Sequence, residues 1–239
     1  MRIIADTHCH TVASGHAYST AMEMITAAKE KNLYAIALTD HGKNLPVSYG
    51  KYFFKNLRSI PEVLKGVRVL KGIELNIIDH LGNTDDDPSD TAKLEWRIAS
   101  IHHTSYEGEM GIEAFTNTWT QIANNPIINV IGHCEIDDFK FDYEKVIPLF
   151  GKNGKLVEIN NNSINVRTSS MKNLYEVAKV CKKHKVRVII NSDAHFCTQV
   201  GSCENSIKIL KEIDFPESLI VNTNEERFKS YLKERGILC

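Results

Sequence analysis

A cluster of histidines near the start of the sequence is the first feature that indicates chemistry. The stretch "ADTHCHTVASGH", residues 5–16, holds His8, His10 and His16 within nine positions and follows a short apolar run. Neutral imidazoles are ligands that Zn²⁺, Mn²⁺ and Fe²⁺ accept, and residues two positions apart, such as His8 and His10, point to the same side of an extended chain. The stretch therefore predicts a metal-ligating segment, in which Cys9 points away and packs.

Metal-capable side chains also occur where other strands are expected to end. Seven of the ten histidines belong to this pattern, which chance does not readily produce. We expect His80, His103 and His184 to be ordinary histidines, although a one-residue error in register would exchange His103 with His102. The residues of the pattern are His8 and His10 with His16 in the loop that follows them, Asp40 and His41, Glu74, His102, His133, Glu158 and Asn160, and Asp193 and His195.

The elements that must position these residues alternate between β-branched runs and amphipathic helical stretches. Strands are expected at 2–5, 34–39, 67–74, 97–102, 128–133, 155–160 and 187–193. Helices are expected at 19–32, with Ser19 or Thr20 as N-cap, and at 113–125, 171–185, 204–213 and 224–236, with a short apolar run at 219–221. This order predicts a parallel α/β sheet in one domain spanning 1–239, closed or nearly closed into a barrel. An open doubly wound sheet is the alternative.

In a parallel α/β barrel the loops after the strands form one face, so the strand-end residues converge there. Seven histidines with Glu74 and Asp193 make nine ligands, enough for two or three ions at three or four protein ligands each. Other chemistries lack their motifs, because the chain contains no G-x-S-x-G, no GxGxxG and no GxxxxGK[ST]. The pattern therefore predicts a multinuclear metal centre.

The composition of the chain indicates which classes of binding partner are unsuitable and in which cell compartment the protein is expected. The 29 basic and 30 acidic residues give a net charge of −1, which argues against binding to nucleic acid or to an anionic membrane. No apolar run reaches the ~18 to 20 residues of a membrane span, and the first residues do not resemble a signal peptide. Six cysteines without a CxxC pair predict reduced thiols in a cytoplasmic protein. The acidic stretch 82–90 is expected to be a solvated turn.

Seven short motifs together resemble the PHP (polymerase and histidinol phosphatase) superfamily of metal-dependent phosphoesterases. They follow the order of that family across nearly the whole chain, and the layout is most similar to the stand-alone YcdX-like phosphatases of bacteria. The motifs are "DTHCH" at 6–10, "TDHG" at 39–42, "GIELN" at 72–76, "ASIHH" at 99–103, "IGHCE" at 131–135, "EINNNS" at 158–163 and "NSDAH" at 191–195.

The resemblance implies a distorted seven-stranded (β/α) TIM-like barrel of the PHP type, with a trinuclear centre. Zinc is the usual ion, and Mn²⁺ or Fe²⁺ suits the same ligands. The nucleophile is then a metal-bound water or hydroxide beside Glu74 and Asp193, with no side-chain nucleophile. Transferred by position, the implied ligands are His8, His10, Glu74 and Asp193 for one ion, Glu74 as a bridge with His102 and His133 for the second, and His16, His41 and His195 for the third.

Four charged residues lie in these motifs or close to them. Asp6 and Asp40 are expected either to orient imidazoles or to cap turns. Lys43 and Arg167 could grip a substrate phosphate, although solvated loop charges are the favoured interpretation of both. An amidohydrolase barrel also begins with H-x-H, but its bridging lysine has no counterpart at a strand end.

The implied activity is a phosphatase that acts on a small phosphomonoester. Two alternatives are a nuclease or phosphodiesterase of the same fold and a catalytically silent, metal-binding regulatory module. The complete ligand set argues against the silent module, and the balanced charge argues against the nuclease. The resemblance also suggests a homo-oligomer.

Overall fold

Seven parallel strands position the chemistry-bearing residues in the computed structural model, which describes residues 1–50 and 52–238. They pair in the order β1-β2-β4-β5-β6-β7-β8. An eighth strand, β3 (Val63–Leu64), pairs antiparallel with β4. The seven parallel strands are β1 (Ala5–Asp6), β2 (Ala35–Leu38), β4 (Val67–Asn76), β5 (Trp96–Ser100), β6 (Val130–Ile131), β7 (Leu156–Asn160) and β8 (Val188–Asn191).

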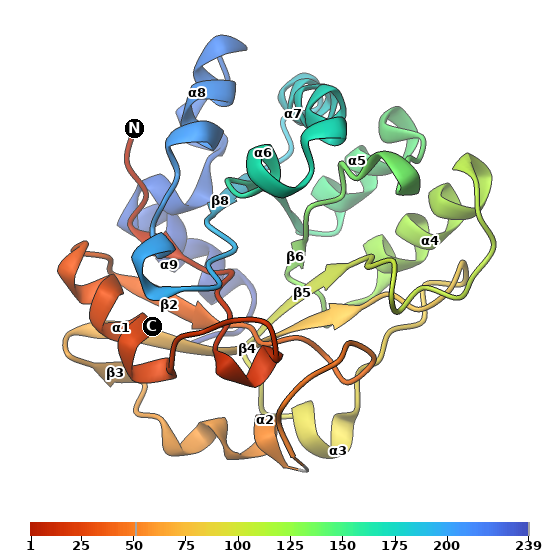
Figure 1. Cartoon of the computed structure of the whole chain (residues 1–239). Helices are drawn as coiled ribbons and strands as arrows, with labels where there is room; N and C mark the ends of the chain where they lie inside the picture. Colours follow the sequence, from red (N-terminus) through yellow and green to blue (C-terminus); the bar gives the residue numbers. More distant parts are fainter. Residues whose placement is uncertain (51, 239) are drawn as a thin grey trace.

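Helices cover the outer face of the strands, and Figure 1 shows α1, α8, α7, α5 and α4 following one another around them. As expected from the sequence, α1 begins after Thr20, whose side chain accepts from the Glu23 N–H in a capping box. The α-helices are α1 (Ala21–Glu30), α2 (Phe53–Asn56), α3 (Pro88–Thr91), α4 (Ile112–Asn124), α5 (Tyr143–Lys152), α6 (Ser163–Val166), α7 (Met171–Lys183), α8 (Glu204–Glu212) and α9 (Glu225–Glu234).

A single asparagine bridges the seam between the first and last strands. Asn222 Nδ2 donates to the carbonyl oxygens of Ala5 on β1 and Ile190 on β8, at 2.7 and 2.6 Å. Its Oδ1 accepts from the Ile190 N–H, and its own carbonyl accepts from the Ile4 N–H. Further along, Cys9 and Ala194 form a parallel bridge. The predicted nearly closed (β/α) barrel is therefore confirmed, and the open doubly wound alternative is wrong.

Two apolar cores stabilise the barrel. Inside it, small residues such as Ala5 and Ala37 leave room for Trp96, which packs near Phe228 and Tyr231 of α9. Helix α9 thus fills the end of the barrel opposite the strand-end loops. Between the strands and the outer helices lies a larger core, and all ten residues of β4 are buried. Burying each large apolar side chain contributes about 1.5–3 kcal/mol.

Several elements differ from the expected pattern. Helix α5 is not predicted, because Pro148 normally interrupts a helix, yet its buried face and its Asp142 N-cap hold it. The β3–β4 hairpin is also missed; its two-residue turn uses positive φ at Lys65 and Gly66. Expected strand 128–133 shrinks to Val130–Ile131. Among the described residues, no helix combines the length and apolarity that crossing a bilayer requires.

Candidate metal centre

All nine predicted ligand side chains lie together at the carboxyl ends of the parallel strands. Seven of them line a cavity of about 510 Å³: His16, His41, Glu74, His102, His133, Asp193 and His195. His8 and His10 are fully buried beside it. Nε2 of His10 lies 3.4 Å from Oε2 of Glu74 and 3.3 Å from Oδ1 of Asp193, so these two rings belong to the same cluster.

Glu74, near the carboxyl end of β4, faces imidazoles on both of its oxygens. Oε2 lies 2.8 Å from Nδ1 of His41 and 3.3 Å from Nε2 of His8. Oε1 lies 2.9 Å from Nε2 of His133 and 3.5 Å from Nε2 of His102. A carboxylate surrounded in this way can bridge two cations, one on each oxygen.

Three groups of ligand atoms are each close enough to hold one ion, with all atoms within 4.8 Å of one another. They overlap, because His10 and His41 each belong to two groups. His16 and His133 lie outside all three, but the exposed ring of His16 packs 5.0 Å from the ring of His41 and 4.9 Å from that of His195, and Nε2 of His133 lies 2.9 Å from Glu74. The groups are His8, His10 and Asp193; His10, His41 and His195; and His41, Glu74 and His102. The implied assignment of ligands to three ions differs from these groups and stays a prediction.

Unpartnered buried atoms test whether a metal fits here. Within the described part of the chain, Nε2 of His8 and Nε2 of His10 are buried without a hydrogen-bond partner. The same holds for Nδ1 of His41 and Oε2 of Glu74, which lie close together but are not aligned for a hydrogen bond. Leaving one buried polar group unpaired costs about 1–3 kcal/mol, so four in one place require an explanation. Nitrogen and carboxylate oxygen atoms directed at a shared space are what a transition metal coordinates. The residues present therefore fit metal ions.

The electrostatics of the cluster are mutually compensating. Burial alone raises the pKa of Glu74, but the rings of His8 and His41 hold that pKa well below its usual range. Burial likewise opposes ionisation of Asp193, and His8, His10 and Arg167 hold its pKa well below normal. Burial also lowers the pKa of His102 to about 4. The carboxylates are ionised and His102 is neutral at pH 7, which suits cation binding. Burial opposes protonation of His8, but Glu158, Glu74 and Asp193 raise its pKa well above the usual range, so a metal at Nε2 of His8 would displace a proton.

Two of these residues have an unusual backbone conformation. His133 has φ 21° and Asp193 has φ 54°, both on the left-handed side that non-glycine residues seldom adopt. Such a conformation costs on the order of 1–3 kcal/mol and concentrates at functional sites. Each follows a short strand, β6 or β8, and the turn aims its side chain at Glu74 or at the neighbouring rings.

Glu158 on β7 supports the cluster and was not among the predicted ligands. Its Oε1 lies 2.7 Å from Nδ1 of His8 and accepts from Asn191 Nδ2 at 2.9 Å. Its Oε2 accepts from the His133 N–H at 2.9 Å. The sequence does indicate that Glu158 faces the cluster, because Glu158 and Asn160 are two positions apart on a buried strand and therefore point to the same side.

Asp40 reaches the cluster only indirectly. Its carboxylate accepts from the N–H and hydroxyl of Thr11, at 2.7 and 2.8 Å, and from the Ser14 hydroxyl at 2.6 Å. Ser14 Oγ in turn lies 3.1 Å from Nδ1 of His10. Asp40 therefore does both things expected of it: it fixes the turn that links His10 to His16, and it orients the His10 ring through Ser14.

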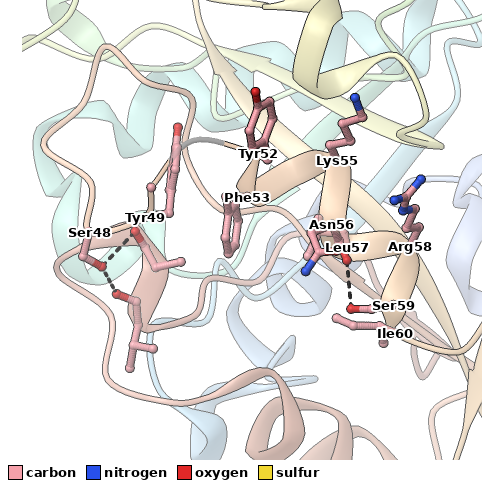
Figure 2. Close-up of a pocket in the computed structure, with 13 residues that line it drawn as sticks. Ser48, Tyr49, Tyr52, Phe53, Lys55, Asn56, Leu57, Arg58, Ser59 and Ile60 are labelled. Carbon is pink, nitrogen blue, oxygen red and sulfur yellow. Dashed lines mark hydrogen bonds between the residues drawn. The ribbon is translucent and has the colours of Figure 1, made fainter.

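A groove of about 900 Å³ lies behind this turn, and Val12 and Ala13 of the turn line it. Figure 2 shows Ser48 at the edge of the groove, beside Tyr49. The Ser48 N–H donates to the Ala13 carbonyl at 2.9 Å, and its hydroxyl donates to the Val12 carbonyl at 2.5 Å. The segment after His41 thus holds the turn from its outer side.

Asp6 does not orient an imidazole, contrary to one of the two expectations. Its carboxylate accepts from the Ser192 N–H and hydroxyl, at 3.1 and 2.5 Å, and from the Gly201 N–H at 2.7 Å. It ties β1 to the loop after β8, which carries Asp193 and His195. The capping alternative is therefore the correct one.

The acidic stretch 82–90 is not simply a solvated turn. Asp85 is 5% exposed and accepts from the backbone and side-chain amides of Asn76, at 2.8 and 2.6 Å. Asn76 Oδ1 lies 2.8 Å from Nδ1 of His102, so Asp85 orients that ring through Asn76. The solvated interpretation is wrong at Asp85 because sequence alone does not show that β4 continues to Asn76.

The side chains of Arg167 and Lys43 differ in their exposure to solvent and in their partners. The Arg167 side chain is 16% exposed, lines the cavity and donates to Oδ2 of Asp193 at 3.3 Å, so its interpretation as a solvated loop charge is wrong. Lys43 is 58% exposed and pairs with Asp87 at 3.7 Å, as a solvated charge does. His103 also lines the cavity, but its Nε2 lies 2.8 Å from Oδ2 of Asp138, whereas His102 faces Glu74, which confirms the expected register.

The cysteines pack as expected. Cys9 is fully buried in the larger core and takes no part in the ligand groups. The five described cysteines are free thiols. Cys239 lies outside the described residues.

Comparisons with known proteins agree with this picture. A model of the PHP domain matches residues 6–162. A protein from Acetivibrio thermocellus described as a probable phosphatase is 40% identical over 235 residues, covering 98% of this chain and 97% of that protein. A probable phosphatase of Thermoanaerobacter sp. strain X514 is 39% identical, covering 98% and 96%.

Two solved structures share the fold. Histidinol phosphate phosphatase from Lactococcus lactis subsp. lactis Il1403, complexed with zinc, L-histidinol and phosphate, has a TM-score of 0.60 and 15% identity, covering 98% of this chain and 94% of that one. A chain of archaeal ribonuclease P with mature tRNA has a TM-score of 0.62 and 13% identity, covering 97% and 90%. At such identities the likeness concerns the fold alone.

Proposed function

Because the chain belongs to the PHP-domain family, we propose that it is a metal-dependent phosphatase that hydrolyses a small phosphomonoester at a centre of two or three transition-metal ions. The observation that carries this proposal is the position of Glu74, with imidazoles within 2.8–3.5 Å of its two oxygens. The relatives described as probable phosphatases support the reaction class. Zinc is the preferred ion in this proposal, with manganese or iron as alternatives.

The residues that would hold the ions are the nine predicted ligands. When bound, the ions supply Lewis acidity toward the phosphoryl oxygens and activate a water molecule for attack at phosphorus. Glu74 and Asp193 are ionised at neutral pH and buried, so their task is to hold cations rather than to donate protons. Those ligands are His8, His10, His16, His41, Glu74, His102, His133, Asp193 and His195.

Arg167 is the residue that we assign to the substrate phosphate. Its guanidinium lines the cavity beside Asp193 and is largely shielded from solvent. A guanidinium offers two parallel N–H donors to a phosphoryl group, and those hydrogen bonds are strongest where water is excluded. Binding there would orient the phosphorus toward the ligand cluster.

The walls of the cavity favour a small monoester over a nucleic-acid strand. Asp137 and Asp138 line the mouth, and the Asp138 side chain is 70% exposed. These carboxylates repel a polyanion, whereas a strand needs a groove with lysines, arginines and stacking platforms. The phosphodiesterase alternative therefore lacks a specific observation in its favour, and a silent module does not explain the complete ligand set.

A comparison of rates tests the proposal. We expect the protein, loaded with Zn²⁺, Mn²⁺ or Fe²⁺, to release phosphate from small sugar or amino-alcohol phosphates faster than it cleaves single-stranded oligonucleotides. Faster cleavage of the oligonucleotide, with binding that weakens steeply as salt rises, would replace the phosphatase by the nuclease. Failure to hydrolyse any phosphoester with any of the three metals would support the silent module.

A further inference from the structure

We infer that Glu135 and Ser163 act as positioning residues for Arg167, holding its guanidinium where a phosphoryl group enters the cavity. The inference deepens the proposed function and rests on it. It concerns a buried carboxylate and a buried hydroxyl that have no place among the nine ligands.

Glu135 lies two residues after His133 and is completely buried. The Ser163 hydroxyl donates a hydrogen bond to its Oε1. Its Oε2 is buried without a hydrogen-bond partner among the described residues. A buried carboxylate is costly unless a cation compensates it. The nearby cation is Arg167, whose guanidinium lies 3.4 Å from the Oγ of Ser163, the same hydroxyl that donates to Glu135.

Ser163 connects the carboxylate to the guanidinium. It begins the short helix α6, and Arg167 follows that helix directly, which places the two residues one turn apart. Nη1 of Arg167 lies 3.4 Å from Ser163 Oγ, while Nη1 and Nη2 lie 3.4 and 3.3 Å from Oδ2 of Asp193. The hydroxyl can accept from Arg167 because its own hydrogen is committed to Glu135.

The two contacts of Arg167 have different consequences. Asp193 is also a proposed ligand, and its Oδ1 faces His8 and His10. A cation bound to Asp193 would neutralise part of the negative charge of this carboxylate and so weaken its attraction for the Arg167 guanidinium. The contact through Ser163 to Glu135 is independent of that cation, so it keeps Arg167 in place when its pairing with Asp193 weakens.

The backbone around Glu135 is fixed to the same region. Asn173 Nδ2, on α7, donates to the Glu135 carbonyl at 3.1 Å and to Asp137 Oδ1 at 2.8 Å. The Asp137 N–H donates to Ser170 Oγ at 2.9 Å. The loop after β6 and the segment from α6 to α7 therefore form one frame, and the Glu135–Ser163–Arg167 chain spans it from inside.

The test measures inhibition by inorganic phosphate, together with metal content, for the metal-loaded full chain. We expect Ser163→Ala and Glu135→Ala each to raise the inhibition constant of phosphate about three- to tenfold, the value of one hydrogen bond. Metal content should remain at the wild-type level. Glu135→Gln should restore most of the affinity, because its amide oxygen still accepts from Ser163. Asn165→Ala, an exposed change on the same helix, is the matched control and should leave phosphate inhibition unchanged.

A double-mutant cycle separates positioning from a general structural effect. In an Arg167→Ala background, Ser163→Ala should produce no further loss of phosphate affinity, because the residue that it positions is gone. Equal losses with and without Arg167, or a Ser163→Ala protein that is inhibited like the wild type, would overturn the inference while leaving the phosphatase intact. A wild-type protein that neither hydrolyses phosphomonoesters nor binds phosphate would instead overturn the proposed function and this inference with it.

Discussion

Nδ1 of His8 and Oε1 of Glu158 lie 2.7 Å apart, and neither side chain is exposed to solvent. A carboxylate at Nδ1 fixes the ring orientation and keeps the hydrogen on that nitrogen, which leaves Nε2 free to coordinate a metal. The other oxygen of Glu158 accepts from the His133 N–H at 2.9 Å. One carboxylate on β7 therefore orients two candidate ligands that belong to different strands.

Replacing Glu158 with glutamine tests this relationship. A glutamine has one acceptor oxygen, so it cannot serve both His8 and the His133 N–H. We expect Glu158→Gln to weaken metal affinity about 10- to 100-fold, measured by elemental analysis during competition with a chelator. Glu144→Gln, an exposed carboxylate paired with Lys183 and His184, is the control and should keep wild-type affinity. Wild-type metal retention in Glu158→Gln would contradict the role of Glu158.

Glu74 should matter more than any ligand at the edge of the cluster. Its two oxygens face separate sets of imidazoles, whereas His16 is exposed and lies outside the three compact ligand groups. We expect Glu74→Gln to lower phosphomonoester hydrolysis by roughly two orders of magnitude or more, and His16→Gln to lower it less. Circular dichroism would show that both variants remain folded. Similar rates for Glu74→Gln and the wild type would refute the bridging role.

Metal removal should destabilise the folded chain. An ion that binds only the folded state at 100 times its dissociation constant adds about 2.7 kcal/mol of stability. For a chain of this length that corresponds to a decrease in Tm of roughly 5–10 °C when a chelator is added. Differential scanning calorimetry before and after chelation, and after return of Zn²⁺ or Mn²⁺, measures it. A Tm that does not respond to chelation would argue against a metal centre.

The buried side chain of Lys155, at the opposite end of the barrel, should make the free energy of unfolding depend on pH. Its ammonium group is buried and donates to the carbonyl oxygens of Asn125 and Ile128. Burial, with the nearby Arg235 guanidinium, lowers the pKa of Lys155 to about 8, whereas an unfolded lysine titrates near ~10.4. Between these values the unfolded state binds more protons, so stability should rise with pH.

The free energy of unfolding of the wild type relative to Lys155→Met should therefore be constant below pH 7 and increase between pH 8 and 10. Urea denaturation at pH 6.5, 8 and 9.5 measures the difference, because the remaining titrations cancel between the two proteins. A difference that falls as pH rises would show that Lys155 is not destabilised by burial.

The periodicity of the strands and the residue types at their carboxyl ends predicted most of the strands and ligand side chains that make up the candidate centre. His102 and His133 illustrate why: each follows a buried apolar strand, and parallel strands bring their carboxyl ends to one face. The register was correct as well, since His102 faces Glu74 and His103 faces Asp138. Local sequence sufficed here because the hydrophobic pattern alone sets which residue points inward.

The supporting residues could not be predicted in the same way. Asp85 and Arg167 come from loops, where no periodicity shows which side chain turns inward. Asp85 is buried because Asn76 extends β4 beside it, and Arg167 is shielded because α6 ends against Asp193. Glu158 lies on a strand, but its task depends on the position of His8, 150 residues earlier. Such partnerships exist only once the tertiary fold has formed.

The asparagine at the barrel seam has a consequence for how the protein is made. His8 and His10 leave the ribosome first, yet the strand that carries them closes the barrel through Asn222, which is synthesised more than 200 residues later. At about 5–20 residues per second, the early ligands are exposed for roughly nine seconds or longer before Asp193 and His195 appear. Ions captured in that interval would meet an incomplete set of donors, so the proposed centre would be complete only after the last strand and Asn222 are in place. If the cluster binds metal as proposed, we therefore expect metal selection to be a late event of biosynthesis, governed by which ions are available when the seam closes.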